Sequence, residues 1–122
     1  MAGLMSKETV GSFLVTKLTN MAVWIHDETG DDQMLRAVNL GGQTLATAFA
    51  VECVKRRDLV RGRDWSGLQN SDLPVSISAQ IPRLIARPQL HDKFWRYLDL
   101  FISVAGYNFQ QEGEYAAEAG SR

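Results

Sequence analysis

The sequence predicts an α+β fold, a small mixed sheet with two helices packed on it, plus a C-terminal helix. Apolar residues recur at helical spacing over Gly41–Arg57, and polar and apolar residues alternate over Leu73–Leu84. The expected elements follow the order strand, helix, strand, helix, arm and strand before that last helix. Strands that alternate with helices along a chain are typical of a mixed sheet with helices on it.

The N-terminal stretch contains the first strand and the first helix of this prediction. Ser12–Lys17 is rich in β-branched and aromatic residues, which favours a strand, while a helix starting at Lys7 is the competing interpretation. Thr19 and Asn20 are good N-cap residues, so a helix is expected from about Asn20 to Glu28. The residues Thr29-Gly-Asp-Asp then predict a turn.

The long helix predicted over Gly41–Arg57 follows a second strand, Met34–Leu40, which is expected to be buried. Gly41 and Gly42 have no Cβ and allow a sharp turn or a close backbone approach where the helix begins. Six residues of this helix share one apolar face: Leu45, Ala46, Phe49, Ala50, Cys53 and Val54. Cys53 is the only cysteine, and its place on this face predicts a packed, inert thiol.

The next elements are an arm and a further strand. Val60–Trp65 is expected to form a short strand or an arm that ends in a turn. Leu73–Leu84 predicts a strand with one face buried, and Pro74 and Pro82 bracket it as at strand ends. The alternation sets Val75, Ile77, Ala79 and Ile81 on the buried face, against Ser76, Ser78 and Gln80.

The C-terminal helix starts near Pro88 and can end at Gly106. Its apolar face carries Leu90, Phe94, Tyr97, Leu98, Phe101 and Ala105. Trp95 and Ile102 fall off this face, which predicts a partner surface. The whole is expected to be one domain over residues 1–109, with a flexible acidic tail over 110–122.

The composition points to a globular intracellular protein. The chain has 122 residues, of which 45% are hydrophobic, enough to bury a core. No apolar run has the length of a membrane span, and the first residues lack the order of a secretory signal. One cysteine cannot form an internal disulfide, so a reducing compartment is expected, either the cytoplasm or the nucleoid or nucleus.

The charge is almost balanced overall but unevenly distributed. From Lys55 to Arg96 nine basic residues stand against four aspartates, a charge of +5. Since the net charge is −1, the rest of the chain carries −6. An asymmetry of this kind can mark a polyanion-binding face, although a mixed solvated surface produces the same count.

Two stretches of this chain resemble the Alba family of small DNA- and RNA-binding proteins. Phe13–Val23, FLVTKLTNMAV, is similar to the first strand, lysine-bearing loop and Thr-Asn helix start of that family. Arg36–Arg57, RAVNLGGQTLATAFAVECVKRR, is similar to its second strand, glycine turn and long second helix. The resemblance covers about Ser12–Leu84 and implies a β-α-β-α-β-β fold, a dimer, and no catalysis.

The resemblance also implies positions for nucleic-acid contacts. Lys17 would be the loop lysine, Gly42 and Gln43 would face the nucleic-acid backbone, and the arm would carry Arg61, Arg63 and Trp65. The chain departs from the family at Thr16-Lys17, where paired basic residues are usual, and at Gln43, a position that is often basic. The short arm, the near-neutral charge and the added C-terminal helix are further departures.

The residues themselves support the same kind of contact, because basic side chains that neutralise phosphates release counterions. Arg56, Arg57, Arg61 and Arg63 could supply these contacts, and Trp65 could stack on an unpaired base. The alternatives are a solvated helix end for Arg56 and Arg57, and a core or interface position for Trp65.

No catalytic or metal-binding pattern is visible in the sequence. His26 and His91 have acidic neighbours but no second histidine or cysteine at ligand spacing. We therefore predict a non-enzymatic protein without a cofactor, which binds DNA or RNA as a homodimer or hetero-oligomer and enters no membrane. The alternative is a protein-interaction or scaffold subunit that binds no nucleic acid.

Overall fold

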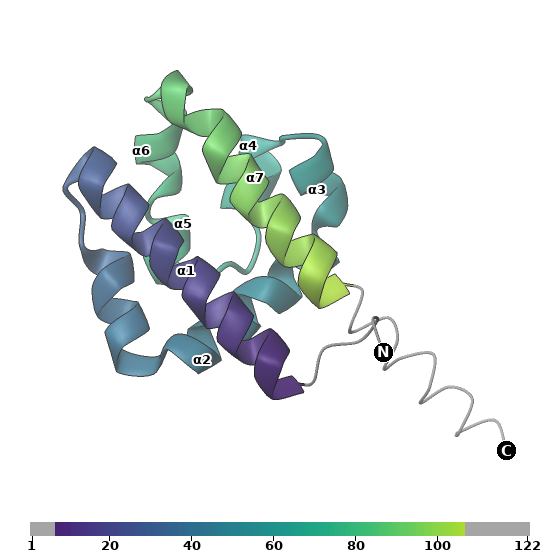
Figure 1. Ribbon diagram of the computed structural model, residues 1–122. Coiled ribbons are helices and arrows are strands. Elements are labelled where there is room, and N and C mark those ends of the chain that lie inside the picture. Colours follow the sequence, from purple (N-terminus) through teal and green to yellow (C-terminus); the bar gives the residue numbers. More distant parts are fainter. Residues whose placement is uncertain (1–6, 107–122) are drawn as a thin grey trace, which may run out of the picture.

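Every regular element of the structure is a helix. A computed structural model describes residues 7–106, and Figure 1 shows no strand in this range. The helices are α1 (Lys7–Thr29), α2 (Gln33–Lys55), α3 (Arg57–Arg61), α4 (Trp65–Gln69), α5 (Val75–Ser78), α6 (Ile81–Ile85), the 3₁₀ turn η1 (Pro88–Leu90), α7 (His91–Phe101) and the last turn η2 (Ile102–Gly106). The predicted α+β fold is therefore wrong, and so is the β-α-β-α-β-β order that the Alba-like resemblance implied.

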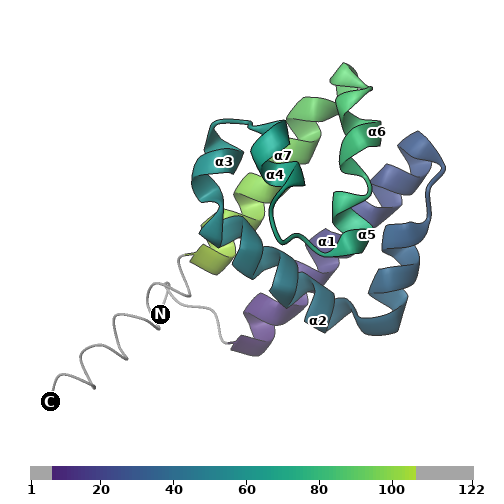
Figure 2. The ribbon, with the colours of Figure 1, turned by 180° about the vertical axis from the view of Figure 1, so that it is seen from behind.

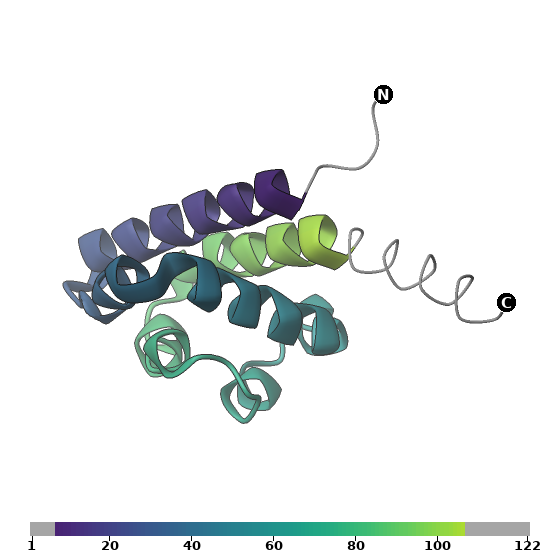
Figure 3. The same cartoon turned by 90° about the horizontal axis from the view of Figure 1, so that it is seen from below.

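The helices form three layers. Helices α1 and α7 lie side by side in opposite directions on one side of the molecule, as Figures 1 and 3 show. Helix α2 lies between this pair and the short helices α3 to α6, which are in front in Figure 2. The core fills the space around α2, and Phe49 of α2 meets Phe101 of α7 with ring centroids 4.9 Å apart.

Helix α1 begins at Lys7, as the competing interpretation of the sequence had it. The strand predicted at Ser12–Lys17 is wrong, and the helix expected from Asn20 to Glu28 is the second half of α1. The buried side chains follow a 3.6-residue period, not an alternation. They are Val10, Leu14, Leu18, Met21, Ala22, Trp24 and Ile25. Burial of this stripe outweighs the modest preference of β-branched residues for strands.

Helix α2 contains the predicted long helix but starts eight residues earlier, at Gln33. The strand predicted at Met34–Leu40 is wrong, because these residues form the first half of α2. Gly41 has non-helical backbone angles, φ −173° and ψ 64°, and bends the helix. The glycine pair therefore marks a kink inside α2 and not its beginning, and Figure 3 shows this bend.

The segment from Arg57 to Ile85 forms four short helices in place of the predicted arm and strand. Val75, expected inside, is 74% exposed, while Gln80, expected outside, is fully buried. The buried set has helical spacing: Ser76, Ile77, Gln80, Ile81 and Leu84. Pro74 precedes α5 and Pro82 lies in the first turn of α6, positions that suit helix starts as well as strand ends.

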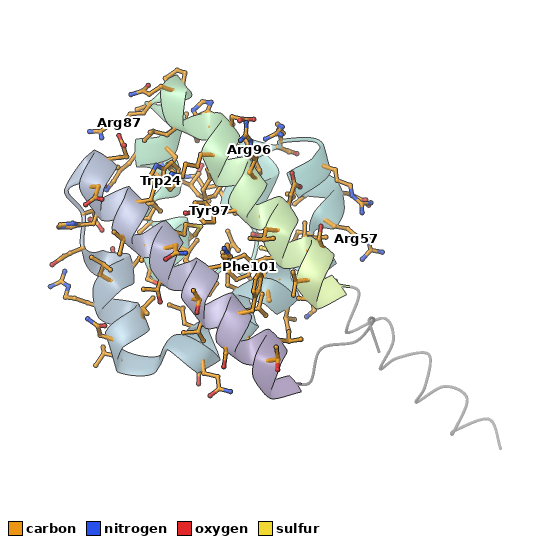
Figure 4. All side chains as sticks on the ribbon, viewed as in Figure 1. Trp24, Arg57, Arg87, Arg96, Tyr97 and Phe101 are labelled. Atoms are coloured by element: carbon orange, nitrogen blue, oxygen red, sulfur yellow. The ribbon has the colours of Figure 1, made fainter. Side chains whose placement is uncertain are left out.

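The C-terminal helix is confirmed, with a wider apolar face than predicted. Trp95 is 2% exposed and Ile102 is 9% exposed, so the partner surface predicted from these two residues is wrong. Trp24 of α1 and Tyr97 of α7 meet in the seam of the two helices, with ring centroids 5.7 Å apart (Figure 4). Burial raises the pKa of Tyr97.

Two further predictions concern the thiol and the chain ends. Cys53 is fully buried and the loss of solvation raises the pKa of its thiol far above the ordinary value, which confirms an inert cysteine. The tail predicted over 110–122 lies outside the described residues. Within residues 7–106, no helix is both long and apolar enough to cross a membrane.

Candidate functional site

A cluster of basic residues lies where α2 ends and α3 follows. Four exposed cationic side chains surround this bend, and we call them the basic corner: Lys55, Arg57, Arg61 and Arg63. The chain leaves α2 at Arg56, whose backbone adopts φ −107° and ψ 27°, and re-enters a helix at once. Arg57 projects from the edge of the molecule in Figure 4, and its Nη1 donates to the carbonyl of Val54 at 3.1 Å.

The arginines outside this corner are mostly neutralised by carboxylates. Nη2 of Arg36 lies 3.0 Å from Oδ1 of Asp32. Nη2 of Arg83 lies 3.2 Å from Oδ2 of Asp31, and Arg96 forms an ion pair with Asp92. Within residues 7–106 no carboxylate forms an ion pair with a member of the basic corner. The four cations of the corner therefore outnumber the two aspartates of the same segment, Asp58 and Asp64, and none of the four is held in an ion pair by a described carboxylate.

Arg56 differs from its neighbours because it serves the fold. Its Nε donates to Oε2 of Glu52 at 3.2 Å, and the same oxygen accepts the backbone N–H of Asp72 at 2.8 Å. Glu52 is only 5% exposed, so its charge needs these donors. Arg56 therefore lies beside the basic corner, but its guanidinium binds Glu52, which holds the segment before α5 against α2.

Arg63 occupies an unusual backbone conformation. Its φ is +51°, the left-handed region, and the backbone N–H groups of Arg63 and Asp64 donate to the carbonyls of Val60 and Leu59. This is the hydrogen-bond pattern of a helix end at which glycine is usual. Cζ of Arg63 also lies 5.9 Å from the ring centroid of Trp95. The chain keeps an arginine at a position that costs about 1 kcal/mol in backbone strain.

The backbone of Arg63 leads to a prediction with a built-in control. Arg63→Gly should leave stability unchanged or raise it by up to about 1 kcal/mol, because glycine relieves the left-handed strain. Arg61→Gly, at the end of α3, removes the same charge but should cost about 1 kcal/mol. Urea unfolding followed by circular dichroism measures both. A clear loss for Arg63→Gly would show that its contact with Trp95 outweighs the strain.

Trp65 is partly buried and packs against the core. Its ring centroid lies 4.5 Å from that of Trp95, 5.3 Å from that of Phe94 and 4.9 Å from that of His91. His91 is held by a hydrogen bond, since its Nε2 lies 2.7 Å from the carbonyl oxygen of Leu84. Because a carbonyl oxygen only accepts hydrogen bonds, this nitrogen carries the proton. Trp65 thus takes the core or interface position that was the alternative to base stacking, with its ring packed against three other rings and partly exposed.

The remaining predicted contacts lie elsewhere. Lys17 is half-buried on α1, with Nζ 5.3 Å from the ring centroid of Phe13. Gly42 and Gln43 line an open hollow between α1 and α2. Thirteen residues of α2 separate Gly42 from Lys55, about 20 Å along the helix axis. The structure thus joins Arg57, Arg61 and Arg63 in one place and separates Lys17, Gly42 and Gln43 from them.

Two residues of this surface were not among the contacts predicted from the sequence. Lys55 belongs to the basic corner, and its signal was the run Lys55-Arg56-Arg57 at a helix end. Leu40 was predicted inside a strand but is 90% exposed at the kink of α2. The absence of any charge from Ala37 to Val51, around a glycine pair, was the available signal for a special surface there.

The described residues offer no metal centre, since no three His, Cys, Asp or Glu side chains gather closely enough to hold an ion within residues 7–106. Comparison with protein-family models, with curated proteins and with solved structures finds no match to this chain. The arguments for function therefore come from the geometry and charge of the surface.

Proposed function

We propose that this protein is a non-enzymatic nucleic-acid-binding protein that contacts phosphates of DNA or RNA through the basic corner. The observation that carries the proposal is that Lys55, Arg57, Arg61 and Arg63 are exposed and free of ion pairs with described carboxylates, whereas Arg36, Arg83 and Arg96 are paired. Phosphate contacts position a protein on a nucleic acid and need no base recognition. The proposal therefore stands without the stacking role first assigned to Trp65.

The arrangement on α3 favours an anionic partner on energetic grounds. Arg57 and Arg61 are four residues apart, so they neighbour each other on the helix and repel by about 0.2–0.5 kcal/mol. A bridging phosphate would convert this repulsion into two charged hydrogen bonds. The guanidinium fork matches the oxygens of a phosphate in bidentate geometry, which an isolated ammonium does not.

The test is a fluorescence anisotropy titration of the full chain with labelled duplex DNA, structured RNA and single strands. Four neutralised phosphates on a duplex would make affinity fall about 100-fold between roughly 50 and 200 mM salt. Absence of binding by the folded protein at low salt would contradict the proposal. Binding of polyglutamate without binding of nucleic acid would instead identify an acidic protein as the partner.

A matched pair of charge-reversal variants locates the contact. Arg57→Glu/Arg61→Glu should reduce affinity about tenfold or more and lower the salt dependence, because two phosphate contacts are replaced by repulsion. Arg36→Glu/Arg96→Glu changes the net charge equally, from −1 to −5, and breaks only exposed ion pairs. Equal losses in the two variants would show that overall charge, and not the basic corner, governs binding.

A second candidate function is that of a protein-interaction subunit, and a separate surface favours it. The exposed Leu40 and the hollow beside Gly42 belong to a part of α1 and α2 that contains no charge. This surface has no cations to hold phosphates, and an exposed leucine suits an apolar contact with another protein. The two functions use different surfaces and are compatible in one molecule.

A further inference from the structure

The last described residue, Gly106, lies against the end of α2, beside the basic corner. A Cβ at Gly106 would lie 3.7 Å from Cγ2 of Val54. The carbonyl oxygen of the same Val54 accepts the hydrogen bond from Nη1 of Arg57 at 3.1 Å, and Lys55 is the next residue of the chain. Figures 1 and 2 accordingly show the end of η2 on the same side of the molecule as α3. The chain beyond Gly106 therefore starts at the edge of the basic corner.

The sequence beyond Gly106 carries the charge opposite to that of the corner. Residues 107–122, which lie outside the described residues, contain one basic residue, Arg122, and three glutamates, Glu112, Glu114 and Glu118. Within the corner segment, Oδ1 of Asp64 accepts the backbone N–H of Gly67 at 2.9 Å and makes no ion pair with a described cation. An acidic sequence thus begins next to cations that have no ion-pair partner among the described residues.

We infer that residues 107–122 dock on the basic corner of their own chain through these three glutamates, and so compete with nucleic acid for the same cations. The docking is argued from position, reach and charge alone. Only the competition rests on the proposed function, because it requires that nucleic acid binds the corner. The segment acts as a built-in competitor that lowers the affinity of the chain for phosphates.

The connection is long enough for this contact. Glu112 follows Gly106 by six residues, which span at most about 20 Å when extended. Arg57 and Arg61 are separated by only about 6 Å along the axis of α3. The other two glutamates have longer connections than Glu112. All three carboxylates can therefore reach the corner without any rearrangement of residues 7–106.

Linkage within one chain makes weak ion pairs effective. Exposed ion pairs are individually weak, but a short connection raises the effective concentration of the carboxylates at the corner to the millimolar range. A guanidinium binds a carboxylate through two parallel hydrogen bonds, as it binds a phosphate, so Arg57 and Arg61 suit either anion. A free acidic peptide and a second copy of the chain lack this linkage at low concentration. The chain's own segment is therefore the favoured occupant.

Carbodiimide cross-linking tests the docking without nucleic acid. The reagent joins a carboxylate to an amine with which it forms an ion pair, and Lys55 is the only lysine of the basic corner. In the full chain at low salt we expect an amide cross-link between Lys55 and one of the three glutamates, identified by mass spectrometry of the monomer. Its yield should fall severalfold at about 1 M salt, where the Debye length is about 3 Å.

Lys93 provides the comparison within the same sample. It is exposed near the start of α7, and most of α7 and η2 separate it from Gly106, about 20 Å along the helix axis. Cross-links from the segment to Lys93 should be several times rarer than those to Lys55. Equal yields at the two lysines, or no cross-link to Lys55, would overturn the inference. Cross-links to Lys55 found only in covalent dimers would overturn it too, because the occupant would then be a second copy.

Charge reversal shows whether the docking depends on the arginines. Arg57→Glu/Arg61→Glu keeps the amine of Lys55 but turns two of the four cations into anions. The cross-link between Lys55 and the segment should therefore become several times weaker in this variant. An unchanged yield would contradict docking by charge.

Neutralising the segment tests the competition. Glu112→Gln/Glu114→Gln/Glu118→Gln in the full chain should bind labelled duplex DNA about three- to tenfold more tightly at low salt, since the cations are no longer occupied by the segment. Fluorescence anisotropy measures the affinity. The gain should shrink as salt is raised, because both contacts are ionic.

A matched variant changes the net charge equally at other places. Asp27→Asn/Glu28→Gln/Asp92→Asn also raises the net charge from −1 to +2. These three acidic side chains are exposed at the end of α1 and the start of α7. This variant should bind the duplex with little gain in affinity. Equal gains in the two variants would overturn the competition, because net charge alone would then account for the effect.

The two experiments distinguish this inference from the nucleic-acid proposal. Cross-links to Lys55 in a chain that binds no nucleic acid support the docking and contradict the proposed function alone. Nucleic-acid binding without any cross-link to Lys55 overturns the inference and leaves the proposed function intact. Cross-links to Lys55 together with an affinity that neutralising the segment does not change overturn the competition.

Discussion

Trp95→Ala is expected to lower the free energy of unfolding by about 3–5 kcal/mol, the usual cost of removing a large buried aromatic side chain. Trp95 is 2% exposed, and its ring centroid lies 4.5 Å from that of Trp65 and 5.4 Å from that of Phe94. Truncation opens a cavity where α4 packs on α7. The other aromatic rings cannot fill this space without leaving their own contacts.

Urea unfolding followed by circular dichroism would measure this loss. Arg96→Ala, at the next position of α7, is the control, because Arg96 is exposed and its ion pair with Asp92 contributes about 0.5 kcal/mol at most. The experiment separates two interpretations of the same residue. A tryptophan on a partner surface could be replaced with little effect on the isolated chain, whereas a core tryptophan could not.

Asp31→Ala is expected to cost about 2–3 kcal/mol, because one carboxylate satisfies three groups, one beside it in the chain and two at the start of α6. Oδ1 accepts the backbone N–H of Gln33 at 2.9 Å and Nε2 of Gln80 at 2.9 Å, while Oδ2 lies 3.2 Å from Nη2 of Arg83. Gln80 is fully buried, and without Asp31 its amide loses one of its two acceptors. Without the contacts of Asp31 with Gln80 and Arg83, the loop before α2 is no longer attached to the start of α6.

The same carboxylate makes stability depend on pH. The hydrogen bond from the Gln33 N–H, then that from Gln80, and the charges of Arg83 and Arg36 hold the pKa of Asp31 below its ordinary value of 3.8, against the opposing effect of burial. A lowered pKa in the folded state stabilises the fold above the unfolded-state pKa, and this contribution disappears as the pH falls through the folded-state value. The difference between the unaltered chain and Asp31→Ala should therefore shrink below about pH 4.

Unfolding free energies at about pH 7 and about pH 3 would check both statements. Asp32→Ala provides the control, since Asp32 is a neighbouring, exposed aspartate that pairs only with Arg36 at the surface. It should cost about 0.5 kcal/mol or less. A loss for Asp31→Ala that is equally small, or that does not change with pH, would contradict the role of Asp31 as the tie between these elements.

Helices with a long apolar pattern were predicted correctly from the sequence. The helix after Gly42 and the C-terminal helix each repeat apolar residues over three turns, a signal that no strand reproduces. Cys53 was placed correctly in the core for the same reason. The position of the basic corner was also predicted from the sequence, by the basic residues between Lys55 and Arg63.

The short segments with an ambiguous pattern depend on long-range packing for their conformation. Residues 75–85 fold as two helices of four and five residues, too short to establish a 3.6-residue period, so the chance alternation of Val75, Ile77 and Ala79 predicted a strand. In α1 the β-branched residues favoured a strand locally, but packing of the Leu14–Leu18 stripe against α2 and α7 outweighed that preference. Local propensity is worth tenths of a kilocalorie per residue, while burial of one large side chain is worth about 1.5–3 kcal/mol.

The candidate site was likewise predicted only in part from the sequence. The sequence shows which side chains are cationic, but not which carboxylates pair with them. Arg56 forms an ion pair with Glu52, whereas Arg57 and Arg61 form none with a described carboxylate. The sequence shows that Trp65 is aromatic, but not that three other rings surround it. Pairing and enclosure depend on residues distant in the chain, and only the packing of α2, α3 and α7 brings those residues together.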